Sequence, residues 1–337
     1  MTALASDPDP RREPAALSPF TRHRGLATWG ERLVPLGEFR AAAARAGRAL
    51  DPAARERARQ GLLAPRAAAL PVEGPWARAV VFGGVYNNHL ALAALLEEAT
   101  RWGAEAIYCL GDLGGFGPSP EKVRPLLAQG GVRVLQGNYE QSLAAGAEDC
   151  NCGYADPRDK HFAELSYRYT ERRCSAVFKR ELGTLPPARR LLVGDRELLA
   201  VHGSPRRVNE FLFASTTPVP YLEVLCDQFS CAGILCTHTG LHWHRRLPSG
   251  RDAVNVGVIG RPANDGRREV WYARLEAGRA GAPLGVALVP LAYDWQALAR
   301  EMRAEGLPEE FVETIETGWW TTCLEVLPAK ERARSRY

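Results

Sequence analysis

The chain has 337 residues, enough for two domains or for one enlarged domain with extensions. Hydrophobic residues make up 46% and charged residues 24%, a globular composition that excludes disordered, collagen-like and disulfide-scaffold proteins. Residues 1–75 carry twelve Arg, no Lys and eight acidic residues, so the whole formal net charge of +4 lies in this segment. No basic stripe with interleaved aromatic residues follows it, and we therefore expect no nucleic-acid partner.

The chain shows no sign of a membrane-spanning or secreted protein. No apolar run approaches the roughly 20 residues that a membrane helix needs. The N-terminal sequence MTALASDPDPRREP lacks the apolar stretch of a secretory signal. We expect a cytoplasmic protein without membrane contact.

Residues 1–75 are predicted to be a basic helical extension rich in Ala, Arg and Pro. Asp51-Pro52 is a helix start signal, which predicts a second helix over 51–63 after a first helix on its N-terminal side. The apolar residues near a helical period in the first helix are Leu33, Leu36, Phe39, Ala43 and Leu50. This arm, or the C-terminal helices, would supply the contact surface of a homo-oligomer.

The hydrophobic pattern changes after Trp76, where short apolar runs alternate with helical stretches such as His89 to Thr100. Such alternation predicts an α/β layered fold over 76–290, with functional residues on loops at the carboxyl ends of the strands. The predicted strands are Arg78 to Phe82, Ala106 to Leu110, Val132 to Leu135, Leu198 to Val201 and Gly233 to Cys236.

Two further regions are predicted to be helical. The polar and aromatic insert 141–190 should form helices over the site and supply substrate contacts. In the C-terminal segment 291–337, the apolar periodicity predicts two amphipathic helices, Trp295 to Arg303 and Glu309 to Trp320.

A polar residue of a metal-ligand type follows each of four predicted strands. These residues are Asp112, Asn138, His202 and His238. Each follows an apolar run and lies beside Gly or another small residue, and strand ends packed side by side would bring them together. The pattern predicts one metal site, whereas any one of these residues alone would more simply be a capping or turn residue.

Most of the eight cysteines are predicted to be buried, reduced thiols. Cys150 and Cys152 differ because they lie two residues apart in a polar loop that ends at Gly153. Two interpretations remain open for this pair, an accessory ligand or redox role and two reduced thiols beside a loop.

Five blocks of the sequence resemble those of the calcineurin-like metallophosphoesterases, in the order of that family, over roughly 77 to 312. The blocks are Gly111 to Pro118, Gly137 to Glu140, Val201 to Pro205, Thr237 to Gly240 and Val254 to Pro262, the last similar to the family's NPGSVGQPR strand. The resemblance implies a four-layer αββα sandwich, here with an N-terminal helical arm and C-terminal helices. It also implies a divalent metal ion held by Asp112, Asn138, His202 and His238.

The sequence departs from the family at the other metal site. The family's opening block D-x-H-G-N aligns with Gly84, Tyr86 and Asn88, and the second histidine of its GHTH block is replaced by Gly240. All the ligands peculiar to one site are thus missing, whereas the other set is complete. A divergent bacterial subgroup with FGG-x-Y, GHSG and DC-x-CG blocks shows a similar pattern, so we expect one divalent ion, Fe, Mn or Zn.

The resemblance also suggests which residues would act beside a single metal ion. Tyr139 takes the place of a histidine proposed as general acid in many family members, and a phenol is a weaker acid that can still donate a proton. A packing role for Tyr139 is an equal alternative. Tyr86 and Asn88 are the other candidate catalytic residues, and Arg206, Arg207 and His242 are the candidate substrate-binding residues.

These observations favour an enzyme, a metal-dependent hydrolase of a small phosphoester. Two alternatives remain. Two histidines and one carboxylate are also the ligands of mononuclear non-haem iron sites, so a redox enzyme on this fold is the second hypothesis. The third is a catalytically retired binding protein that keeps its metal.

Overall fold

The computed structural model describes residues 26–29, 32–35, 70–279 and 281–333. The chain divides into two compact units, Met1–Ala58 and Arg59–Tyr337. In the first unit, β1 (Leu26–Trp29) pairs antiparallel with β2 (Arg32–Pro35). The predicted helix therefore cannot begin at Leu33, which lies in a strand beside Thr28, Trp29 and Val34, residues that favour extended backbone. The rest of the predicted helical arm lies outside the described residues, apart from 70–75.

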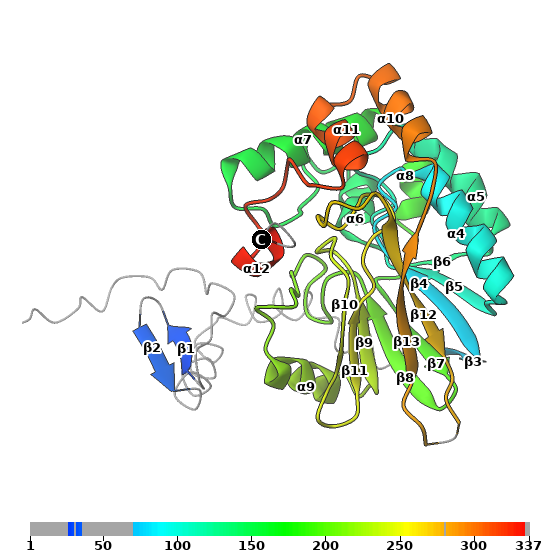
Figure 1. Cartoon of the computed structure of the whole chain (residues 1–337), viewed down its shortest axis with the longest axis vertical. Coiled ribbons are helices and arrows are strands. Elements are labelled where there is room, and N and C mark those ends of the chain that lie inside the picture. Colours follow the sequence, from blue (N-terminus) through cyan, green and yellow to red (C-terminus); the bar gives the residue numbers. More distant parts are fainter. Residues whose placement is uncertain (1–25, 30–31, 36–69, 280, 334–337) are drawn as a thin grey trace, which may run out of the picture. The chain divides into compact units, whose positions relative to one another are not determined.

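The second unit contains two β-sheets (Figure 1). The six-stranded sheet has the order β10 (Trp243–Arg246), β11 (Asp252–Asn255), β9 (Gly233–Cys236), β8 (Arg196–Val201), β7 (Ala188–Val193) and β3 (Val72–Trp76). The five-stranded sheet has the order β13 (Gly285–Leu291), β12 (Val270–Glu276), β4 (Arg78–Phe82), β5 (Ala106–Cys109) and β6 (Arg133–Val134). Because β3 begins at Val72, the α/β unit starts a few residues before the predicted boundary at 76.

The parallel strands set the direction in which the site residues emerge. In the five-stranded sheet β4, β5 and β6 run parallel, with Phe82 opposite Cys109 and Cys109 opposite Val134. In the six-stranded sheet β9 runs parallel to both β8 and β11. Loops after β5, β6, β8 and β9 therefore carry the polar residues that the sequence analysis selected.

The two sheets pack face to face through a buried apolar layer. Val81 and Ala273 of one sheet and Leu198 and Val254 of the other are fully buried in the same cluster. Alternate residues of these strands face the helices instead, which is why the strands are apolar on both faces and read as continuous apolar runs. Burial on both sides of each sheet makes the two sheets the rigid support of the loops above them.

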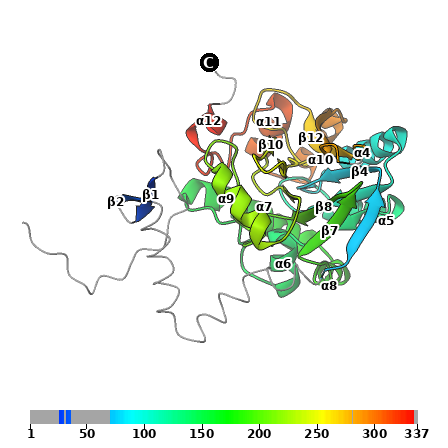
Figure 2. The ribbon, with the colours of Figure 1, turned by 90° about the horizontal axis from the view of Figure 1, so that it is seen from below.

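Helices cover the outer faces. α4 (His89–Trp102), α5 (Val123–Gln129) and α6 (Asn138–Ala145) pack on the five-stranded sheet, and α9 (Val219–Gln228) packs on the six-stranded sheet. Figure 2 shows α9 and α4 on opposite sides of the strands. This arrangement of helices, sheet, sheet and helix confirms the predicted four-layer αββα sandwich.

The insert and the C-terminal segment meet above the sheets. The insert contains α7 (Pro157–Arg173) and α8 (Ala176–Leu182), and β7 begins at Ala188, just before its predicted end. The C-terminal segment contains α10 (Trp295–Ala304), α11 (Glu309–Thr317) and α12 (Ala329–Arg332), which confirms helices near the two predicted positions. Phe162 of α7 packs against Phe311 of α11, with ring centroids 5.9 Å apart.

No helix within the described ranges is long and apolar enough to cross a lipid bilayer.

Candidate metal centre

Four strand ends from the two sheets bring the predicted ligands together. Asp112 follows β5 and Asn138 is the first residue of α6 after β6, so both come from the five-stranded sheet. His202 directly follows β8 and His238 follows β9, so both come from the six-stranded sheet. All four side chains are buried. The site therefore lies where the carboxyl ends of the two sheets meet.

Three of these side chains present ligand atoms to a common point. Nε2 of His202 lies 3.2 Å from Oδ2 of Asp112 and 3.0 Å from Nδ1 of His238. One ligand atom from each residue lies within 4.8 Å of the others. Two imidazoles and one carboxylate at these separations suit a divalent transition metal.

Main-chain carbonyls orient both histidines. Nδ1 of His202 donates to the carbonyl oxygen of Leu110 at 2.7 Å, which leaves Nε2 free to face Asp112. Nε2 of His238 donates to the carbonyl oxygen of Cys152 at 3.2 Å, which leaves Nδ1 to face the same point. A hydrogen bond from the remote ring nitrogen is the usual way in which proteins select the tautomer of a metal-binding histidine.

Asn138 supplies the best test of whether these residues fit a cation. Its Nδ2 donates to the carbonyl oxygen of Cys150 at 2.7 Å. Its Oδ1 is buried and has no hydrogen-bond partner among the described residues. A buried acceptor without a donor is costly, and a metal ion would satisfy it. The residues present therefore fit a divalent ion with Asn138 as the fourth ligand.

The charges and burial of the cluster shift the pKa values of His238 and Asp112 in the direction that metal binding requires, and the pKa of His202 in the opposite direction. Burial, together with His202, lowers the pKa of His238 to about 3, so this imidazole is neutral and has a lone pair at neutral pH. Burial opposes ionisation of Asp112, but His202 outweighs that effect and holds the pKa of the carboxyl below its usual value. Burial also disfavours the charged form of His202, but Asp112 outweighs it and raises the pKa of His202. A metal ion must therefore displace a proton from His202.

The backbone around the ligands is strained and is held in place by Glu140. Asp112 and His238 have φ values of 57° and 61°, in the left-handed region that few non-glycine residues adopt. The Glu140 carboxylate accepts hydrogen bonds from the main-chain N–H groups of Asp112 and Leu113, at 2.8 and 2.7 Å, and of Gly137 at 2.8 Å. Glu140 thus fixes the loop that presents Asp112.

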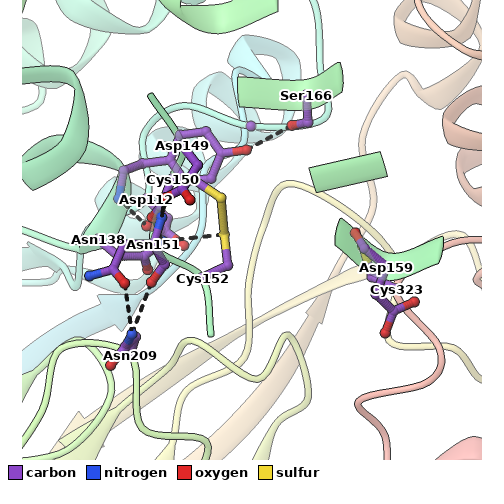
Figure 3. Close-up of a disulfide and its surroundings, with 12 residues drawn as sticks. Asp112, Asn138, Asp149, Cys150, Asn151, Cys152, Asp159, Ser166, Asn209 and Cys323 are labelled. Carbon is purple, nitrogen blue, oxygen red and sulfur yellow. Dashed lines mark hydrogen bonds between the residues drawn. A yellow bond between two sulfur atoms is a disulfide. The ribbon is translucent and has the colours of Figure 1, made fainter. Parts of the chain in front are cut away.

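Cys150 and Cys152 form a disulfide, so the expectation of two reduced thiols is wrong for this pair. Figure 3 shows the disulfide beside Asn138 and Asp112. Asn138 and His238 donate to the carbonyl oxygens of Cys150 and Cys152, and Nδ2 of Asn138 also lies 3.5 Å from Sγ of Cys152. The pair therefore orients two ligands through its main chain. The other six cysteines are free and buried, as predicted.

The positions that would carry the missing ligands are filled. A Cβ added at Gly84 would lie 2.8 Å from Cζ of Tyr86 and 2.5 Å from a methyl carbon of Val258. A Cβ at Gly240 would lie 2.8 Å from the indole of Trp320. Aromatic rings thus occupy the space beside the two glycines, which supports one metal site rather than two.

Two of the three predicted catalytic residues have structural contacts instead. The hydroxyl of Tyr139 hydrogen-bonds Ser166 of α7 at 2.8 Å, and burial raises its pKa well above the usual value, which argues against a proton donor. The side chain of Asn88 caps α4 by accepting from the N–H of Ala91 at 3.0 Å. Tyr86 is buried beside Phe116. These contacts favour packing and capping roles for Tyr139 and Asn88.

Two of the predicted substrate-binding residues, Arg206 and His242, have contacts with residues outside the ligand cluster. Arg206 donates to the hydroxyl of Tyr221 at 2.9 Å, and Arg207 is exposed. His242 stacks on Trp271 with ring centroids 3.8 Å apart and lines a hollow of about 340 Å³ that none of the four ligands borders. The substrate-binding role of these three residues stays a prediction.

Sequence reasoning missed two groups near the centre. Phe211 stacks on His238, with ring centroids 4.4 Å apart, and no local pattern identifies it. Arg261 is a buried arginine beside Gly240. The sequence could have drawn attention to Arg261, because this arginine replaces the glutamine of the family's NPGSVGQPR strand.

Comparison with solved structures identifies the fold. A metallophosphoesterase from Sphaerobacter thermophilus superposes with a TM-score of 0.55 at 24% identity, over 72% of this chain and 99% of that one. A hypothetical protein from Pyrococcus horikoshii superposes with a TM-score of 0.61 at 23% identity, over 74% of this chain and 100% of that one. This chain has the calcineurin-like metallophosphoesterase fold.

The metallophosphoesterase fold confirms the resemblance that the five sequence blocks indicated. No protein-family model matches the sequence, and no curated protein does. At these identities the comparisons concern architecture alone, so the chemistry of the site has to be argued from its own residues.

Proposed function

We propose that this protein is a mononuclear metal-dependent hydrolase of a small phosphoester. The observation that carries the proposal is the convergence of Asp112, His202 and His238, with the unpartnered Oδ1 of Asn138 buried beside them. The similar Sphaerobacter protein is itself named a metallophosphoesterase, which supports this class of reaction.

The four ligand residues would hold one divalent ion, Fe, Mn or Zn. When bound, such an ion supplies a Lewis acid that lowers the pKa of a coordinated water and polarises a phosphoryl oxygen. The chain's own contribution is to orient the ligands. Leu110 and Cys152 select the histidine tautomers, and Glu140 fixes the loop of Asp112. Tyr139 holds α7 through Ser166 and supplies no proton in this proposal.

The test combines metal analysis with hydrolysis. Protein purified without oxygen should contain about one equivalent of metal per chain and hydrolyse p-nitrophenyl phosphate. His238→Ala should lose both the metal and the activity. His161→Ala is the matched control, because His161 is exposed on α7 and makes an edge-to-face contact with Phe162. Two equivalents of metal would contradict a mononuclear site.

The same experiment separates the alternatives. The disulfide next to the ligands is the observation that favours an oxidative role. One equivalent of iron, with oxygen consumption and no hydrolysis, would establish the redox enzyme. A full complement of metal without either activity would establish a metal-containing binding protein.

A further inference from the structure

Arg261 is buried but lacks the partner that a buried charge normally has. Arg261 lies in the segment between β11 and β12, and the residue is only 5% exposed. Its Nε is buried without a hydrogen-bond partner, and among the described residues no carboxylate pairs with its guanidinium. A buried charge without a counter-charge is unfavourable, and such groups concentrate at functional sites.

Aromatic rings hold the guanidinium in place. Cζ of Arg261 lies 3.5 Å from the ring centroid of Trp320, 4.6 Å from that of Phe116 and 5.8 Å from that of Tyr86. The rings attract the cation through cation–π interactions, but they accept no hydrogen bonds from the N–H groups, which lie in the plane of the guanidinium. They fix its orientation and leave its hydrogen-bonding capacity unused.

Other stacked arginines of this chain show what is missing. Arg133, Arg173 and Arg274 also lie over aromatic rings. Each of these three has a glutamate partner, with an N···O distance between 2.9 and 3.2 Å. Four other stacked arginines donate to main-chain carbonyl oxygens instead: Arg78, Arg158, Arg245 and Arg268. Arg261 differs from all of these because its buried Nε has no hydrogen-bond partner among the described residues.

The position of Arg261 places it beside the metal centre. Nη2 of Arg261 lies 3.5 Å from the point that a Cβ of Gly240 would occupy, and Gly240 is two residues after the ligand His238. The charges of Arg261 and Asp112 both act on the hydroxyl of Tyr86. The hollow that Arg261 lines with residues of α10 and α11 has a volume of about 10 Å³, room for one water, so a phosphate does not fit on that side of the guanidinium.

We propose that Arg261 is the anion-binding residue of the site and that its guanidinium receives two phosphoryl oxygens of a phosphate monoester. The identity of the substrate class rests on the proposed function. A guanidinium binds two oxygens in parallel. A monoester has three non-bridging oxygens, enough for this pair and for one oxygen toward the four ligands. A diester has only two, so the site should prefer monoesters.

Calorimetric titration of the metal-loaded, full-length protein with inorganic phosphate tests the proposal. Arg261→Gln should weaken phosphate binding at least tenfold while the metal content per chain stays the same. Arg261→Lys keeps the charge but loses the paired N–H groups, and should weaken binding at least threefold. Arg274→Gln is the matched control, since Arg274 is stacked on Trp102 and already paired with Glu98. Its phosphate affinity should stay within twofold of wild type.

Two results would overturn the assignment. One is wild-type protein that binds no phosphate even at 10 mM, which would mean a dissociation constant above about 10 mM. The other is an unchanged phosphate affinity in Arg261→Gln or, should that variant not fold, in Arg261→Lys. A different result would contradict the proposed hydrolase activity while leaving the anion site intact. Phosphate binding that depends on Arg261, without hydrolysis of any ester, would keep the anion site and remove the enzyme.

Discussion

The main-chain carbonyl oxygen of Cys152 accepts a hydrogen bond from Nε2 of His238 at 3.2 Å, and Cys152 is disulfide-bonded to Cys150. The carbonyl of Cys150 in turn accepts from Asn138 at 2.7 Å. Two of the four predicted ligands, Asn138 and His238, thus depend on the conformation of the three residues 150–152. A cavity of about 450 Å³ borders both cysteines, so small reductants can reach the disulfide.

Reduction of this disulfide should weaken metal binding. Without the covalent link the two carbonyls lose their fixed positions, and changes in such supporting contacts typically lower metal affinity 10- to 100-fold. Competition with a chromophoric chelator, with and without a phosphine reductant, measures the effect. A Cys150→Ser/Cys152→Ser variant should have the weaker affinity under both conditions. Equal affinities in all four experiments would show that the disulfide does not support the ligands.

The Asp112–His202 pair predicts opposite pH dependences with and without metal. In the metal-free protein the pKa of His202 is raised above its unfolded value of about 6.5. The pair therefore stabilises the fold fully below that pH, and its contribution is lost as pH rises through the raised pKa. Metal affinity should rise over the same interval as His202 loses its proton.

Urea unfolding and metal titration across pH 6 to 9 check this prediction. Asp112→Asn removes the charge that raises the pKa of His202, so the metal-free variant should lose the pH dependence in this interval. His238 should not contribute, because its pKa is about 3. A metal-free stability that increases from pH 6 to 9 would contradict the assignment.

Restoring a histidine at position 240 should not create a second metal site. In Gly240→His the new side chain would meet the indole of Trp320 at 2.8 Å, at a backbone φ of +75°. We expect a loss of about 3 kcal/mol or more in the free energy of unfolding and no second equivalent of metal. Gly146→Ala is the control. Gly146 has a φ of +64° and nothing within 4 Å of an added Cβ, so backbone strain alone should cost about 1 kcal/mol.

Tyr139→Phe separates a packing role from proton donation. The substitution removes one buried hydrogen bond to Ser166 and should cost about 1 kcal/mol of stability. Because that hydroxyl points to α7, the rate of hydrolysis at saturating metal should stay within about twofold. A loss of 100-fold in kcat with unchanged metal content would restore Tyr139 as the proton donor.

Glu140→Gln should destabilise the loop that carries Asp112. A carboxamide has one acceptor oxygen, whereas the Glu140 carboxylate uses both oxygens for three main-chain N–H groups. Leaving a buried N–H without an acceptor should lower the free energy of unfolding by about 2 to 3 kcal/mol. Chemical denaturation measures this loss, and metal content at saturating metal should be retained. Unchanged stability would show that the loop is held by other contacts.

The amino-acid sequence alone was enough to predict the layers of the fold and the convergence of Asp112, His202 and His238. The apolar runs before Asp112, Asn138, His202 and His238 are local features, and parallel strands place their carboxyl ends at one edge of a sheet whatever the details of packing. Likewise, the glycines at 84 and 240 predict the loss of one metal site, because a glycine has no side chain that could bind a metal ion.

Only the tertiary structure decided the roles of the surrounding side chains. Tyr139 finds Ser166 27 residues away, His238 finds the carbonyl of Cys152 across 86 residues, and Arg261 stacks on Trp320 from a different segment of the chain. A phenol, a disulfide or a guanidinium acquires its function from the atoms around it. Those atoms come from distant parts of the sequence and are brought together only when the two sheets, the insert and the C-terminal helices pack.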